Sequence, residues 1–213
     1  MNLVGDWRYV YPGEVETFGG LEARKKAFEK DGFIGEYLKL LNITTKVGST
    51  VFCHGGITPH FSRLGINWIN DKTHETIVTY MESQGHRGKS HGIFGGMGPT
   101  WYRGYALEEE DEICSVLDEA LELLEANRMV VGHTVQHDGA IRTRCDGKII
   151  LIDIGISRAY NRGKGALEIR GNSVSALYAD KILKLDSPPP YKMPSKSTGT
   201  KESATEAIIH DEL

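Results

Sequence analysis

The sequence predicts an α/β protein built of α+β layers. The clearest observation is a helix over residues 112–127, in which Ile113, Leu117, Leu121 and their neighbours follow the i, i+3, i+4, i+7 spacing of an amphipathic helix. Short runs of β-branched and apolar residues, as at 50–53 and 129–131, predict buried strands. Strands alternate with helices and several short strands then follow, an order typical of a layered sandwich.

The remaining elements follow from local patterns. Helices are expected over residues 21–30, 34–41 and 66–81, and strands over 42–47, 50–53, 129–131, 140–144, 148–154, 166–169 and 174–178. Gly48-Ser49 and Asp146-Gly147 provide tight turns, which predicts two hairpins. Residues 84–98 are rich in glycine and polar side chains and predict a loop.

Composition indicates one globular domain and argues against nucleic-acid binding and against a membrane span. The chain has 213 residues, of which 39% are hydrophobic and 25% charged, enough for a single domain over residues 1–185 and a tail. Its net charge of -4, with both signs interspersed, leaves no basic surface for nucleic acid. No apolar run is long enough for a membrane span.

Three cysteines are scattered through the chain without a CxxC spacing. Cys53 and Cys145 lie in or beside predicted strands, and Cys114 lies on the helix at 112–127. All three are expected to be buried thiols outside any paired framework. Cys53 precedes His54, but neighbours on a strand point to opposite faces, so its thiol is not expected to share a ligand with that imidazole.

Two histidines follow predicted strands and adjoin glycines. His54 begins the His-Gly-Gly segment after residues 50–53, and seventy-nine residues later His133 follows Gly132 after residues 129–131. Each could simply hydrogen-bond within a turn. Two imidazoles at the carboxyl ends of apolar strands instead favour half of a metal site, because neutral imidazole is a common ligand for zinc and iron.

Other polar residues have simpler interpretations. His137 is expected at the rim of the site, His60 in an exposed turn, and His86 and His91 in the glycine-rich loop. Asp153 ends a buried strand, where its carboxylate could either orient His133 or cap the following turn.

Arg103 lies between the two histidines in the segment GPTWYRGYA (98–106). Its guanidinium could stack on Trp101 or Tyr102 as a cation–π pair. Alternatively it could serve as a fixed fork that binds phosphate oxygens, a geometry arginine matches with two donors.

The motifs CHGG, GPTWYRGYA, VVGHTVQHDG and KIILIDIGIS, in this order, resemble those of the metal-dependent PPP-type phosphatases among the calcineurin-like phosphoesterases. The resemblance is closest to the bacterial-type, Shewanella-like branch and covers about residues 1 to 178. It implies a calcineurin-like four-layer αββα sandwich. It also implies two divalent metal ions (Mn, Fe or Zn), with His54 and His133 as ligands of one ion and Arg103 as a phosphate-binding residue.

Three earlier motifs of that family, GDxHG, GDxxDRG and GNHE, do not occur in the sequence. They supply the remaining metal ligands, a second arginine and the general-acid histidine. The resemblance therefore implies that the N-terminal half of the sandwich is absent and that this chain alone is inactive. A gene model that starts at an internal Met would explain this, and a naturally shortened protein is the alternative.

The last residues carry a different signal. A proline run at 188–190 and the polar stretch after it predict a disordered tail over residues 186–213. The chain ends in His210, Asp211, Glu212 and Leu213, the HDEL sequence read by the retrieval receptor of the endoplasmic reticulum. No signal peptide is visible at the N-terminus. The protein is expected in the lumen of that compartment if a precursor carries a signal peptide, and in the cytoplasm otherwise.

Two functions follow. The first is a metallophosphatase acting on phosphomonoesters, above all those of phosphoproteins, represented here by its C-terminal part. The second is a non-catalytic remnant that binds a phosphorylated ligand or partner through Arg103 and the loop around His91.

Overall fold

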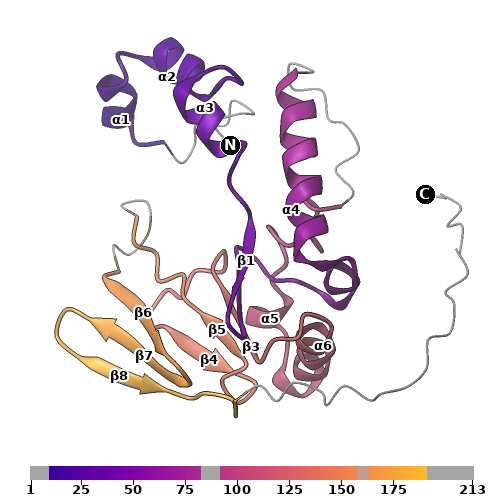
Figure 1. Cartoon of the computed structure of the whole chain (residues 1–213). Coiled ribbons are helices and arrows are strands. Elements are labelled where there is room, and N and C mark those ends of the chain that lie inside the picture. Colours follow the sequence, from indigo (N-terminus) through magenta and orange to yellow (C-terminus); the bar gives the residue numbers. More distant parts are fainter. Residues whose placement is uncertain (1–9, 83–91, 158–159, 161–162, 191–213) are drawn as a thin grey trace, which may run out of the picture.

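The computed structural model describes residues 10–82, 92–157, 160 and 163–190 (Figure 1). A five-stranded mixed sheet has the order β1 (Thr44–Val47), β2 (Thr50–Cys53), β3 (Arg128–Val131), β5 (Ile149–Leu151) and β4 (Arg142–Arg144). Strands β2, β3 and β5 are parallel, while β1 and β4 run antiparallel to their neighbours. The two hairpins expected at Gly48-Ser49 and Asp146-Gly147 are confirmed as β1–β2 and β4–β5.

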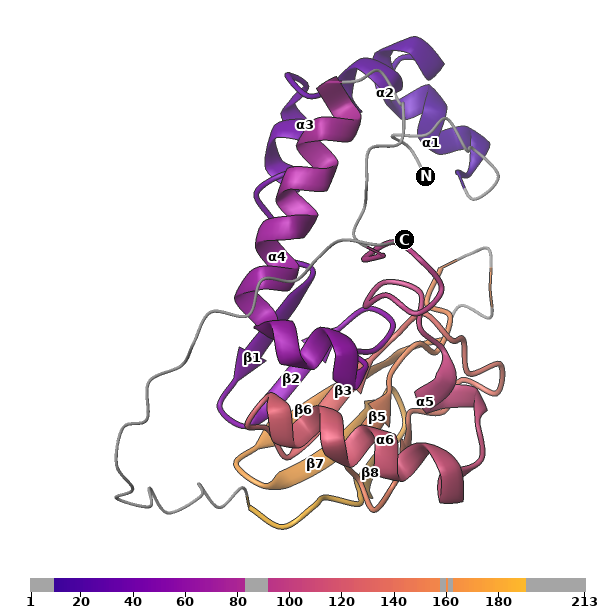
Figure 2. The same cartoon turned by 90° about the vertical axis from the view of Figure 1, so that its right-hand side faces the viewer.

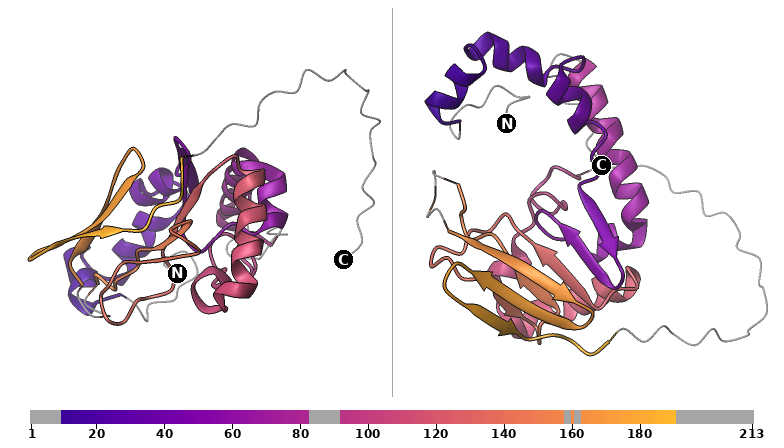
Figure 3. Two further views of the ribbon diagram at one scale, coloured as in Figure 1. Left: turned by 90° about the horizontal axis from the view of Figure 1, so that it is seen from below. Right: turned by 60° about the vertical axis from the view of Figure 1, so that its left-hand side comes forward.

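A second sheet packs on one face of the first. It is antiparallel, with β6 (Gly165–Arg170), β7 (Ser173–Tyr178) and β8 (Ile182–Leu185) in that order. Val130 and Ile150 of the first sheet share a buried cluster with Val174 and Ala176 of the second. The chain therefore forms a mixed α/β structure in which two sheets lie face to face (Figure 3).

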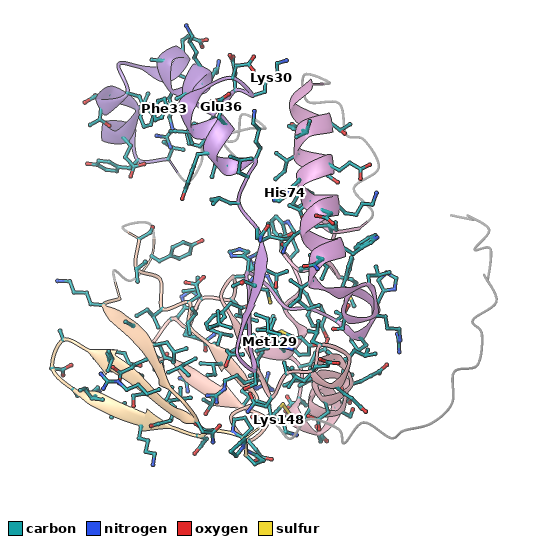
Figure 4. All side chains as sticks on the ribbon, in the orientation of Figure 1. Lys30, Phe33, Glu36, His74, Met129 and Lys148 are labelled. Atoms are coloured by element: carbon teal, nitrogen blue, oxygen red, sulfur yellow. A yellow bond between two sulfur atoms is a disulfide. The ribbon has the colours of Figure 1, made fainter. Side chains whose placement is uncertain are left out.

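Helices α4 (Pro59–Glu82) and α6 (Glu110–Leu123) cover the other face (Figure 2). Because side chains alternate along a strand, Met129 and Val131 point to the helices while Val130 points to the second sheet. Met129 lies in this interior, and Lys148 at the edge of the layer forms an ion pair of 2.7 Å with Asp118 of α6 (Figure 4).

Several elements differ from the sequence-based expectation at their ends. The helix expected over 112–127 ends at Leu123, because Glu125 takes a left-handed conformation with φ 50° and turns the chain into β3. The helix expected over 66–81 begins at Pro59 and is interrupted at Gly65, where φ is 84°. The short α5 (Gly104–Leu107) and strand β8 were not anticipated.

Three short helices precede the sheet. They are α1 (Pro12–Thr17), which was not expected, α2 (Leu21–Phe28) and α3 (Phe33–Leu38). The guanidinium of Arg24 lies 4.8 Å from the ring centroid of Phe18 and 5.2 Å from that of Phe28, which holds α1 and α2 together. The group lies beside the upper half of α4 (Figures 1 and 2), and His74 of α4 hydrogen-bonds the carbonyl of Leu41 at 3.0 Å.

The described part of the expected tail rests on the body. Pro188 is buried, and its carbonyl accepts a hydrogen bond of 2.8 Å from Asn172 Nδ2. The carbonyl of Pro189 accepts a second one, of 3.2 Å, from Asn127 Nδ2. The segment 186–190, placed in the tail on composition, is thus anchored to the ordered domain. In the part of the chain that the structure describes, no helix has the length and apolarity needed to cross a membrane.

The expectation of three unpaired thiols is wrong. Cys114 of α6 and Cys145 of the β4–β5 turn form a disulfide, with their Cα atoms 5.4 Å apart. The pair is separated by 31 residues, and only the packing of α6 against this turn brings it together, so local spacing gave no signal. Cys53 is a free thiol, and burial raises its pKa to about 12, which keeps it protonated at neutral pH.

Candidate functional site

The carboxyl ends of the three parallel strands bring three polar side chains to one edge of the sheet. His54 follows β2, His133 follows β3 after Gly132, and Asp153 follows β5. The segments are joined by backbone hydrogen bonds: the Gly132 amide donates to the His54 carbonyl at 2.9 Å, and the Gln136 amide donates to the Asp153 carbonyl at 2.7 Å. The parallel pairing of β2 with β3, which the sequence did not predict, therefore places both histidines side by side.

The two imidazoles face one another closely. Their ring centroids are 4.9 Å apart and the rings are inclined at 55°. His133 Nε2 is buried and has no hydrogen-bond partner among the described residues. A buried polar atom without a partner is costly, and at a functional site it often marks the position of a ligand. His133 also has a φ of 65°, a conformation that non-glycine residues adopt mainly where the surrounding structure imposes it.

The electrostatics of the site favour neutral imidazoles. Burial lowers the pKa of His54, and the nearby guanidinium of Arg103 acts in the same direction against the opposing charge of Asp153. The pKa of His133 is lowered by burial, by Arg103 and by His54, in that order, against Asp153 and a hydrogen bond to the backbone of Trp101. Both rings thus keep an unprotonated nitrogen at neutral pH, the form that binds metal ions.

Glycines after His54 allow a second loop to approach. The amides of Gly55 and Gly56 both donate to the carbonyl of Pro99, at 2.7 and 3.2 Å. A Cβ atom at Gly55 would come within 2.9 Å of the Tyr102 amide nitrogen, closer than such atoms normally approach. The two glycines after His54 therefore allow the segment that carries Arg103 to pack directly against the backbone at this point.

Arg103 reaches the imidazoles from this second loop. Its exposed guanidinium donates through Nη1 to the carbonyl of His133 at 2.9 Å and to Thr134 Oγ1 at 3.2 Å. The indole of Trp101 meets the His133 ring edge-on, with centroids 5.0 Å apart. Tyr102 instead packs into the interior against Tyr105. The site is thus a cation, an indole and two imidazoles on one face, and the roles of Trp101 and Thr134 were not anticipated from the sequence.

Of the two roles that the sequence left open for Asp153, the structure shows the cap of the following turn. Its Oδ1 accepts a hydrogen bond of 3.1 Å from the Gly155 amide and so caps the turn after β5. Its negative charge also raises the pKa of both imidazoles.

The donor set suits part of a metal centre. Two neutral imidazoles, one of them with a ring nitrogen that no described residue hydrogen-bonds, and an adjacent carboxylate are groups that bind zinc, iron or manganese. Within the described ranges, Glu110, Cys114 and Cys145 also place potential ligand atoms close together, but the disulfide occupies both sulfur atoms.

The other predicted histidines do not join this cluster. His60 is exposed, with its ring edge-on to Phe61 at 5.0 Å, and His137 is exposed in the loop after His133. His86 and His91 lie outside the described residues.

Comparison with known proteins shows which proteins this chain is similar to. No family model matches the chain. It is 34% identical over 195 residues to the uncharacterized protein C1840.07c of Schizosaccharomyces pombe. It is 30% identical over 189 residues to Shewanella-like protein phosphatase 2 of Arabidopsis thaliana, and 32% identical over 176 residues to Shewanella-like protein phosphatase 1 of Plasmodium berghei. These matches cover 87%, 87% and 77% of the chain, and 58%, 47% and 47% of the relatives, so the chain spans about half their length.

Solved structures give the same class. A cold-active protein tyrosine phosphatase of a Shewanella species superposes with a TM-score of 0.70 at 28% identity, over 87% of this chain and 56% of the other. A mutant of a cold-active protein tyrosine phosphatase superposes with a TM-score of 0.72 at 28% identity, over 87% and 56%. Two of these relatives and both solved structures are named as phosphatases. The chain belongs to the Shewanella-like protein phosphatase family.

Proposed function

We propose that the protein is a metal-dependent phosphatase that hydrolyses phosphomonoesters, above all those of phosphoproteins. The observation that carries this proposal is the pair of neutral imidazoles, His54 and His133, in which Nε2 of His133 has no partner in the described part of the chain and the guanidinium of Arg103 hydrogen-bonds the carbonyl of the same residue. A pair of imidazoles able to bind a metal ion, next to a fixed cation, suits the hydrolysis of a phosphate ester, because both can stabilise the charge that develops on the phosphoryl oxygens. The names of the relatives support the phosphoprotein substrate.

The proposed roles follow from the contacts. His54 and His133 would ligate a divalent ion (Mn, Fe or Zn), and a bound ion supplies a Lewis acid and an activated water. Arg103 is held by the His133 carbonyl and Thr134, which leaves its remaining donors for a phosphate oxygen. The indole of Trp101 packs edge-on against the His133 ring and would limit the access of bulk water to that side of it.

The described residues supply fewer donors than two metal ions require. Two imidazoles and Asp153 lack the bridging carboxylate that holds paired ions together. We therefore propose that the helix, sheet and sheet layers are the C-terminal portion of a calcineurin-like αββα sandwich, and that the 213-residue chain by itself turns over little or no substrate.

The test compares the 213-residue chain with the longest protein that sequencing of its transcript reveals. Both are assayed with p-nitrophenyl phosphate and a phosphopeptide, with and without Mn²⁺. We expect metal-dependent hydrolysis from a product that contains the remaining ligands. Arg103→Ala should retain metal and lose roughly 10²–10³-fold in kcat/KM, because one preorganised donor is removed from the transition state. Arg142→Ala, an exposed arginine paired with Asp138, is the matched control.

If neither the 213-residue chain nor the longer protein hydrolyses either substrate, the proposal that the protein is a phosphatase is wrong. If phosphate binding then persisted and depended on Arg103, the non-catalytic phosphate-binding remnant would be the better description. An equal loss of metal in the Arg103→Ala variant would show that Arg103 has a structural role.

We further propose that the protein resides in the lumen of the endoplasmic reticulum. The terminal HDEL sequence fits the retrieval receptor, and the Cys114–Cys145 disulfide suits an oxidising compartment, because cytosolic thiols are kept reduced. In cells that express the chain behind a signal peptide, removal of His210 to Leu213 should release it into the medium. Continued retention after that deletion, measured by immunoblotting of medium and lysate, would refute this location.

A further inference from the structure

Arg144 of β4 lies against the short helix that follows Arg103. Its Nη1 donates to the Tyr105 carbonyl at 2.7 Å, and its Nη2 donates to the Glu108 carbonyl. Its side chain is only 16% exposed. A four-residue helix has almost no intrinsic stability, and the carbonyls at its end have no partner within the helix. Arg144 therefore provides hydrogen bonds that α5 cannot supply for itself.

Arg144 is in turn fixed from α6. Its Nε lies 3.5 Å from Glu110 Oε1, and the other oxygen of that carboxylate accepts a bond of 2.8 Å from the Cys145 amide. Cys145 is joined to Cys114, one turn further along α6, by the disulfide. Glu110, Cys114, Arg144 and Cys145 thus form a single unit, the α5 clamp, in which a covalent bond fixes the strand end that carries the guanidinium.

The clamp is connected to the phosphate-binding side of the molecule through α5. Arg103 is the residue that immediately precedes this helix, so the direction of its side chain depends on where α5 lies. On the opposite side, the Tyr105 hydroxyl donates to the Ile57 carbonyl at 2.9 Å, next to the His54 segment. Helix α5 is therefore held between the metal-binding segment and the clamp.

We propose that Arg144 is a positioning residue for Arg103 and that the Cys114–Cys145 disulfide sets how firmly it does so. The inference rests on the proposed role of Arg103 in binding phosphate. Reduction by a dithiol such as dithiothreitol transfers two electrons and two protons to the Cys114–Cys145 bond, giving two protein thiols and one oxidised, cyclic reductant. The freed strand end then holds Arg144 less firmly, α5 moves more, and Arg103 binds phosphate less well while metal binding is unchanged.

The experiment measures two independent quantities on the full chain. Amide hydrogen exchange over residues 104–108 reports on α5, and the affinity for inorganic phosphate in the presence of Mn²⁺ reports on Arg103. Arg144→Ala and Cys114→Ser should each speed the exchange, and should weaken phosphate binding by roughly 10-fold, as is typical when a partner that orients a binding group is lost. Arg144→Lys should restore part of both, since a lysine can still donate to one carbonyl. Arg142→Ala on the same strand should change neither quantity.

Dithiothreitol should reproduce the effect of Cys114→Ser in the unaltered chain and should have no further effect on that variant. Because the reductant needs no substitution, it tests the clamp even if a variant folds poorly. Unchanged exchange over residues 104–108 after reduction and in Arg144→Ala would overturn the clamp. Faster exchange with unchanged phosphate affinity would overturn the link to Arg103, provided that Arg103→Ala weakens binding. If Arg103→Ala has no effect on phosphate binding, the proposed function fails. The hydrogen exchange over residues 104–108 alone then shows whether the clamp holds α5.

Discussion

Replacing His133 should remove metal binding from this site and, in a catalytically complete protein, phosphatase activity with it. The buried Nε2 of this imidazole has no hydrogen-bond partner among the residues that the structure describes, and burial and Arg103 lower the pKa of the ring so that it is neutral. Even residues that only orient a metal ligand change affinity by 10–100-fold, so loss of the ligand itself should weaken Mn²⁺ or Zn²⁺ binding by about 100-fold or more. Titration calorimetry, with Co²⁺ absorption as a second readout, measures this directly.

The choice of substitution matters because His133 has a left-handed backbone with φ 65°. Asparagine tolerates that conformation better than alanine, so His133→Asn separates the loss of the imidazole from backbone strain. His60→Ala removes an exposed imidazole and is the matched control. Metal affinity that is unchanged in both His133→Asn and His54→Ala would mean that these rings do not form a metal centre.

Leu117→Ala should strongly destabilise the helix layer. Leu117 is fully buried in the cluster between α6 and the sheet, and removing a buried leucine side chain typically costs about 2–5 kcal/mol. Urea unfolding followed by circular dichroism should show the lower free energy of unfolding as an earlier midpoint. Leu123→Ala is the control, because Leu123 lies on the same helix but is 41% exposed, and we expect a change within about 0.5 kcal/mol. Equal losses in both variants would show that α6 does not pack as described.

The sequence predicted those parts of the fold that depend on local patterns. The α6 helix was evident from its apolar spacing, and both hairpins from their turn residues, because these signals lie within a few residues of one another. His54 and His133 were also expected at the carboxyl ends of two strands, but the parallel pairing that brings them to one edge joins residues far apart in the chain and was not predicted. The ends of α6 and the break at Gly65 depended on single backbone conformations that a periodic pattern does not report.

Features that depend on distant residues escaped prediction. The disulfide requires α6 to meet the β4–β5 turn, and nothing in the spacing of Cys114 and Cys145 indicates that contact. Helix α5 has too few residues for a periodic signal, and it is held by Arg144 from a later strand. Thr134 was missed as a partner of Arg103 because the two are 31 residues apart in the chain.

The parallel pairing of β2 with β3 has a consequence for the order in which the protein folds. The β1–β2 hairpin can form locally, whereas pairing Thr50 with Arg128 closes a loop of 78 residues. Closing a flexible loop of that length costs about 4 kcal/mol of chain entropy, so the hairpin can precede the arrival of β3. His54 and His133 are therefore apart until this late step, and an ion that bridges them would stabilise the long-range pairing itself.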